Sequence, residues 1–104
     1  MEISFKNKKL EKLCEDSVSL KRKYGSVQAE LIIQRINELL SAENIFDISK
    51  LPQIRLHLLR GNYEGCYGLD IQQPFRLIVA YLNGDPSDLK SITEVKIIEI
   101  TDYH

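Results

Sequence analysis

The chain has 104 residues, of which 43% are hydrophobic, and a formal net charge of −1 at pH 7. This length predicts a single domain over residues 1–104, and the hydrophobic content excludes global disorder. The sequence has no apolar run near the roughly 18 residues that a membrane-spanning helix needs. We also expect no cleavable leader, so we predict a cytoplasmic protein without a membrane partner.

Hydrophobic periodicity predicts that the first half of the chain is mainly helical. Residues 3–5 are a candidate short strand. Apolar positions then recur at helical spacing over residues 8–23, which predicts one continuous helix that ends at Gly25. Ser26 is the expected N-cap of a second helix, whose apolar face runs over residues 29–40.

After a polar connection at residues 41–52, which has room for one helical turn, the hydrophobic period changes to two. In residues 54–59 the alternation places the apolar side chains on one side of a strand and Arg55 and His57 on the other. The further predicted strands are residues 66–71, 75–82 and 92–102. Two helices followed by consecutive strands predict an α+β fold, with a two-helix hairpin packed on a small, mostly antiparallel β-sheet.

The charges are unevenly distributed along the chain. Residues 1–23 carry seven basic and four acidic side chains, whereas the remaining residues carry seven basic and eleven acidic ones. Fields act locally, over about 10 Å in salt, so a basic segment on a nearly neutral protein can still bind phosphate. A solvated helix face is the simpler explanation. The candidate nucleic-acid-binding residues are Lys6, Lys8, Lys9, Lys12, Lys21, Arg22 and Lys23.

Basic side chains that are candidates for catalysis or anion binding lie in and beside the predicted strands. His57 is on the polar side of its strand, and Arg60 follows where that strand meets a turn. Arg76 lies within an apolar strand, where a guanidinium costs free energy unless an anion or a carboxylate meets it. Pairing with Asp70 or Glu99 is the simpler explanation of Arg76.

The sequence ends with Asp102, Tyr103 and His104, directly after a run of β-branched residues. Chain ends usually carry little chemistry, so an acid, a phenol and an imidazole there indicate a candidate site. If the strands are neighbours, these side chains converge with His57 and Arg76 on one face of the sheet. Such a set suits cleavage of an RNA phosphodiester, in which imidazoles exchange protons and guanidinium groups hold the phosphate oxygens. Composition and spacing alone support only an anion site.

We expect no cofactor and no metal ion. The two cysteines, Cys14 and Cys66, lack metal-ligand spacing and are expected to be buried or half-buried free thiols in a reducing compartment. The phosphodiester chemistry described above requires no metal.

The segment LHLLRGNYEGCYGLDIQQPFRLIVAYLNGD and the terminal DYH resemble the HigB-type killer toxins of the RelE/ParE superfamily. Those toxins carry a Leu-His-Pro-Leu-Lys-Gly-Asp-type motif, an aromatic strand, an arginine in the next strand, an Asn-Gly-Asp turn and an Asp-Tyr-His end. The opening ISFKNKKLEKL is similar to their short first strand and basic first helix. The resemblance spans nearly the whole chain and implies two helices packed on a small, mostly antiparallel sheet.

The resemblance also implies an activity and partners. It implies a toxin of a type II toxin–antitoxin system, acting as a ribosome-dependent endoribonuclease that cuts messenger RNA and blocks translation. The implied partners are a HigA-like helix-turn-helix antitoxin, the ribosome and messenger RNA. Operator DNA would be contacted only through the antitoxin.

Residue by residue, the resemblance implies a catalytic set. Arg60, which stands where the family has lysine, and Arg76 would bind the phosphate. His57 or His104 would exchange protons, and which of the two is the base stays open. Tyr103 would stack on or position the base or ribose.

Asp102 would orient an imidazole or the reactive hydroxyl.

Two other functions stay open at this stage. A ParE-like relative would inhibit DNA gyrase without cutting RNA, but the DYH ending and His57 count against it, because such a binder needs no proton-transfer groups. A catalytically silent member would act only by antitoxin pairing and operator repression, which the acidic balance favours.

Overall fold

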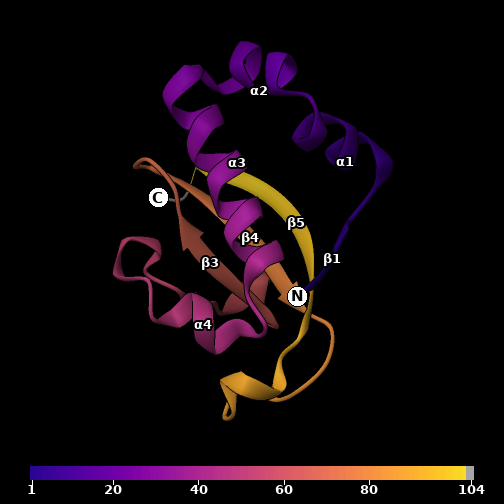
Figure 1. Cartoon of the computed structure of the whole chain (residues 1–104), viewed down its shortest axis with the longest axis vertical. Coiled ribbons are helices and arrows are strands. Elements are labelled where there is room, and N and C mark those ends of the chain that lie inside the picture. The colour runs from indigo at the N-terminus through magenta and orange to yellow at the C-terminus, as the bar shows by residue number, and fades with distance from the viewer. Residues whose placement is uncertain (103–104) are drawn as a thin grey trace.

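The computed structural model describes residues 1–102. The first half is helical apart from one short strand, and strands dominate the second half (Figure 1). The helices are α1 (Lys8–Glu15), α2 (Ser17–Tyr24), α3 (Ser26–Ser41) and α4 (Ile45–Ser49). The strands are β1 (Glu2–Phe5), β2 (His57–Leu58), β3 (Cys66–Asp70), β4 (Phe75–Tyr81) and β5 (Glu94–Asp102). None of the described helices is long and apolar enough to span a membrane.

The five strands form one mixed sheet in the order β1-β5-β4-β3-β2. All neighbouring strands are antiparallel except β1 and β5, which are parallel. Helix α3 crosses one face of this sheet, α2 lies beside the beginning of α3, and α1 lies between α2 and β1 (Figure 1). The prediction of an α+β fold with a mostly antiparallel sheet is confirmed.

The prediction of a single helix over residues 8–23 is wrong, because Asp16 ends α1 and begins α2. The backbone N–H of Asp16 donates to the carbonyl of Leu13, and its carboxylate accepts from the backbone N–H groups of Val18 and Ser19. An aspartate that caps the next helix in this way competes with continuation of the previous one. The hairpin therefore consists of α2 and α3, with α1 as a separate helix. Gly25 rather than Ser26 is the N-cap of α3.

The prediction of a strand over residues 54–59 is also wrong for most of its length. Residues 52–54 form a short 3-10 turn, and Arg55 adopts a left-handed conformation with φ of 49°. Only His57 and Leu58 pair with β3, so the alternation fails: Leu58 is exposed and Leu59 is buried. The predicted helical turn in residues 41–52 is present as α4.

The core fills the space between the helices and one face of the sheet. From the sheet it contains Leu69, Leu77, Val79, Val95 and Ile97, all fully buried, which pack with Leu39 of α3 and two isoleucines of α4. The opposite face carries a smaller apolar cluster of Leu59, Cys66 and Ile78. We call this opposite face the site face.

Candidate active site on the face of the sheet away from the helices

A buried aspartate joins two arginines on the site face. Asp70 and Arg76 are paired across β3 and β4, so their side chains lie side by side. The Asp70 carboxylate lies 3.3 Å from Nε of Arg76 and 3.4 Å from Nη1 of Arg55. The side chain of Asp70 is 7% exposed and that of Arg55 is 65% exposed. The carboxylate therefore fixes one guanidinium within the sheet and holds a second at the surface.

Helix α3 holds the strand end that carries Asp70. Nε of the buried Arg35 donates to the backbone carbonyl of Asp70 at 2.8 Å, and Nη1 donates to Glu38 at 3.0 Å. The buried side chain of Gln28 both donates to the carbonyl of Gln72 and accepts from its N–H. These bonds satisfy buried polar groups and fix the turn between β3 and β4.

Arg55 also positions His57, through its backbone. Nδ1 of His57 lies 2.6 Å from the carbonyl oxygen of Arg55. A carbonyl only accepts, so Nδ1 carries the proton, and in the neutral ring Nε2 is an acceptor. The left-handed conformation of Arg55 is uncommon for a residue with a side chain, and such strained positions cluster at functional sites.

Gly68 makes room for the imidazole. It pairs with His57 across β2 and β3, and a Cβ atom built at this position would lie 3.1 Å from Cε1 and Nε2 of His57. Such contacts are shorter than ordinary van der Waals contact, so any other residue would displace the ring. The absence of a side chain at residue 68 thus lets the imidazole lie over the strand.

These contacts connect His57, Arg55, Asp70 and Arg76, which we call the Asp70 network. Strand β3 lies between β2 and β4, so the three strands that carry the network are consecutive in the sheet. Residues 57, 68 and 78 form one cross-strand row, and residues 70 and 76 lie two positions further along. His57 and Arg76 therefore share the site face, as the sequence analysis expected, and Arg76 is paired with Asp70.

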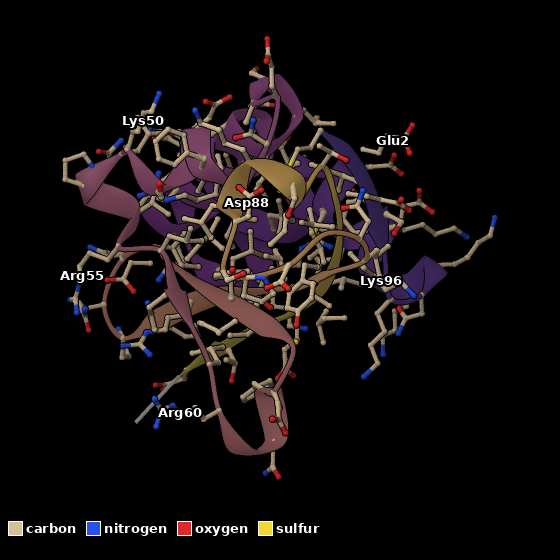
Figure 2. All side chains as sticks on the ribbon, turned by 90° about the horizontal axis from the view of Figure 1, so that it is seen from below. Glu2, Lys50, Arg55, Arg60, Asp88 and Lys96 are labelled. Carbon is tan, nitrogen blue, oxygen red and sulfur yellow. The ribbon has the colours of Figure 1, made fainter. Side chains whose placement is uncertain are left out.

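Arg60 lies on the loop that leads from β2 to β3. Leu59 anchors the loop against Ile78, and the hydroxyl of Tyr63 donates to the Glu99 carboxylate on β5. Arg60 itself is exposed between these two anchors. Figure 2 shows Arg55 and Arg60 on the same side of the molecule, away from Lys96. A second exposed cation, besides Arg55, thus projects from a loop whose two ends are anchored.

The predicted chain-end residues lie only partly within the described chain. Asp102 is exposed and pairs with Phe75, one row beyond the pair of Arg76 and Thr101. Because successive side chains of β5 point to opposite faces of the sheet, Asp102 lies on the face of Phe75 and not on the face of Arg76. Tyr103 and His104 lie outside the described residues.

Three of the seven candidate nucleic-acid-binding residues line a basic groove. Lys6, Lys9 and Lys23 surround a pocket of about 250 Å³, whose remaining wall includes Ile98 and Glu99 of β5. Glu99 is on the site face because it pairs with Ile78, so the groove adjoins the loop that carries Arg60. The other four candidates are exposed but do not line this groove: Lys8, Lys12, Lys21 and Arg22.

Both cysteines are free thiols. Burial, with a smaller contribution from Glu15, raises the pKa of the half-buried Cys14 to about 11. Burial also raises the pKa of the buried Cys66. Within residues 1–102 no group of three or more His, Cys, Asp or Glu side chains is arranged to hold a metal ion.

Arg55 and Gly68 were not predicted from the sequence as parts of the site, and Asp70 was predicted only as a possible ion-pair partner of Arg76. An aspartate ending an apolar strand, opposite an arginine in the next strand, was a visible signal for the pair. The sequence carries no such signal for Arg55 and Gly68. The role of Arg55 depends on its own left-handed backbone conformation, and that of Gly68 depends on its register opposite His57.

The chain matches a protein-family model over most of its length. The model of the HigB-like toxin family, described as the RelE-like toxin of the type II toxin–antitoxin system HigB, matches residues 3–91. The matched segment includes the whole Asp70 network, Arg60 and the basic groove residues of the first half, and it stops before β5. No curated protein matches the chain.

Proposed function

Because the chain belongs to the HigB-like family of RelE-like toxins of type II toxin–antitoxin systems, we propose that it cuts messenger RNA on the ribosome. Membership of this family implies an antitoxin as partner. In this proposal the toxin acts in the cytoplasm, where ribosomes and messenger RNA are its further partners, and it meets operator DNA only through the antitoxin.

The Asp70 network is the observation that carries this proposal. Cleavage of RNA by its own 2′-hydroxyl places developing negative charge on the phosphate oxygens, and guanidinium groups stabilise such charge. Arg76 has its orientation fixed by Asp70, and the exposed Arg60 closes on the phosphate from the loop. A preorganised cation loses little entropy when the substrate binds.

His57 is the proposed base. With Nδ1 donating to the Arg55 carbonyl, its neutral ring presents Nε2 as a proton acceptor. Nε2 would take the proton of the 2′-hydroxyl as that oxygen attacks phosphorus. His104 would then protonate the leaving 5′ oxygen, and Tyr103 would stack on or position the base or ribose. Asp102 has no role in the proposed reaction, because it shares the face of Phe75 and not that of Arg76.

The basic groove supports binding to the ribosome. Its three lysines lie beside the site face, so ribosomal RNA phosphates held there would keep the site close to the messenger RNA. Lys8, Lys12, Lys21 and Arg22 would add to the attraction from the exposed surface of α1 and α2.

One observation favours the second candidate, a catalytically silent member that acts only by antitoxin pairing and operator repression. The Asp70 carboxylate offsets part of the positive charge of Arg76 and Arg55, so a phosphate must compete with it. A measurement of cleavage separates the two candidates.

The proposal is tested by following messenger RNA integrity in a translation reaction, with and without ribosomes. We expect cleavage only with ribosomes, and a loss of about 100-fold or more for Arg60→Ala, since one charge-stabilising donor contributes about that much. Lys50→Ala is the matched control, because Lys50 is also an exposed cation on a loop but is far from Arg60 in Figure 2. Intact RNA in all reactions would contradict the proposal and favour a catalytically silent protein that acts only by antitoxin pairing and operator repression.

A further inference from the structure

Helix α1 separates two grooves of opposite character. One side of the helix faces the basic groove through Lys9, Leu10 and Leu13. The other side faces a second groove through Glu11, Cys14 and Glu15, which recur at the three- and four-residue spacing of one helix face. The two grooves therefore attract ligands of different charge.

The second groove is apolar at its base and acidic at its rim. Its volume is about 280 Å³, and its walls come from β1, α1 and α3. Ile3, Phe5, Ile36 and Leu40 supply apolar side chains, and Leu40 is 55% exposed, which is high for a leucine beside a groove. Ile3 and Phe5 pack against the core on the helix side of the sheet, so this groove lies away from the site face.

The charges decide what kind of ligand fits. Glu11 and Glu15 are the charged residues among those that line the groove, so a phosphate backbone would be repelled there. The Cys14 thiol stays neutral at physiological pH, because burial raises its pKa to about 11. An apolar segment flanked by basic side chains complements both the base and the rim.

Strand β1 adds a backbone edge to the groove. It is the edge strand of the sheet and pairs with β5 on one side, where Ile3 is opposite Val95 and Phe5 is opposite Ile97. Exposed strand edges are templates for an added strand from another chain. A partner segment could thus pair with β1 while its apolar side chains enter the groove.

We propose that the groove between β1, α1 and α3 binds the antitoxin, through an apolar segment flanked by lysine or arginine. Family membership supplies a protein partner, and the acidic rim selects a cationic one. This surface is separate from the Asp70 network, so the inference goes beyond the proposed RNA cleavage and does not depend on it.

The test is a titration of the purified cognate antitoxin into the purified chain, followed by calorimetry. Leu40→Lys should weaken binding at least tenfold, because it removes an apolar contact and adds a charge that repels a cationic segment. Val27→Lys is the matched control, since Val27 is 57% exposed and also on α3 but does not line the groove. This control should bind as the wild type does.

A second variant tests the charge complementarity. Glu11→Lys with Glu15→Lys should also weaken antitoxin binding at least tenfold, with an unchanged circular dichroism spectrum. Wild-type affinity for both groove variants would overturn the proposal. So would a change in sedimentation of the toxin alone on substitution of Leu40, since the groove would then be an interface between copies of this chain. RNA cleavage by the free variants should remain at the wild-type level.

Discussion

At the scale of single residues, the position of the His57 ring depends on the absence of a side chain at Gly68. The imidazole occupies the space that a side chain at residue 68 would fill, and its Nδ1 is held by the Arg55 carbonyl. Gly68 thus leaves room for the ring, and the bond to the Arg55 carbonyl sets its tautomer. A base placed in this way needs no rearrangement when the substrate arrives.

Gly68→Ala tests this arrangement. The added methyl group should displace the imidazole by a few tenths of an ångström or more, and cleavage should fall by about 10- to 100-fold. The melting temperature should change little, since alanine is tolerated in a strand and the backbone of Gly68 has no positive φ. On a His57→Ala background the same substitution should have no further effect on the cleavage rate. Full activity of Gly68→Ala would show that the ring position is not important.

Asp70 pairs with two arginines. Asp70→Asn removes the buried charge that pairs with Arg76, which is 19% exposed. Breaking a buried ion pair destabilises proteins by about 3–5 kcal/mol, and the partial exposure of both arginines lowers the expected loss to about 2 kcal/mol. Urea denaturation measures this loss. A matched Asp88→Asn variant, at an exposed loop residue, should keep the wild-type free energy of unfolding.

At the scale of elements, Asp16 shows why the helix over residues 8–23 is divided. Periodicity runs through Asp16 without a break, so the pattern of apolar residues could not reveal the division. The decisive signal was the sequence Asp16-Ser17-Val18-Ser19, which is typical of an N-cap.

The cap makes a prediction about pH. The Ser19 hydroxyl and backbone N–H donate to the Asp16 carboxylate and lower its pKa. The carboxylate therefore stabilises the fold above its unfolded pKa of about 3.9, and this contribution is lost as the pH falls through the lower folded pKa. Thermal melts should show a smaller loss of stability on acidification for Asp16→Asn, which keeps a capping oxygen without the charge. Parallel curves for the two proteins would contradict this.

The segment at residues 54–59 shows a second limit at this scale. Its alternation is typical of a strand, yet Pro52 starts a 3-10 turn and Arg55 reverses the chain with a positive φ. The conformation of Arg55 is set by contacts of both its side chain and its carbonyl. The side-chain contact is with Asp70 on β3, far along the chain, so no local rule predicts it, whereas the carbonyl contact is with the nearby His57.

At the scale of the molecule, the fold class could be predicted from the sequence, because apolar residues recur at helical spacing in the first half and at every second residue in the second half. The helical half covers one face of the sheet, and the resemblance to HigB-type toxins agrees with the family match over residues 3–91. The site was only partly predictable. His57 and Arg76 could be chosen by residue type, whereas their link through Arg55 and Asp70 depends on register and on burial.

The two faces of the molecule have separate tasks in this account. The site face carries the Asp70 network, Arg60 and the adjoining basic groove, all suited to RNA. The helix side carries the acidic and apolar groove, suited to the antitoxin. Substitutions on one face should therefore leave the function of the other unchanged.

In the proposed reaction, His57 starts RNA cleavage by taking a proton from the 2′-hydroxyl. The most direct measurement is analysis of the RNA ends produced on programmed ribosomes by the wild type and by His57→Ala. The account predicts 2′,3′-cyclic phosphate and 5′-hydroxyl ends for the wild type, and a cleavage rate at least 100-fold lower for the variant with an unchanged melting temperature. Products with 5′-phosphate ends, or wild-type rates for His57→Ala, would contradict it.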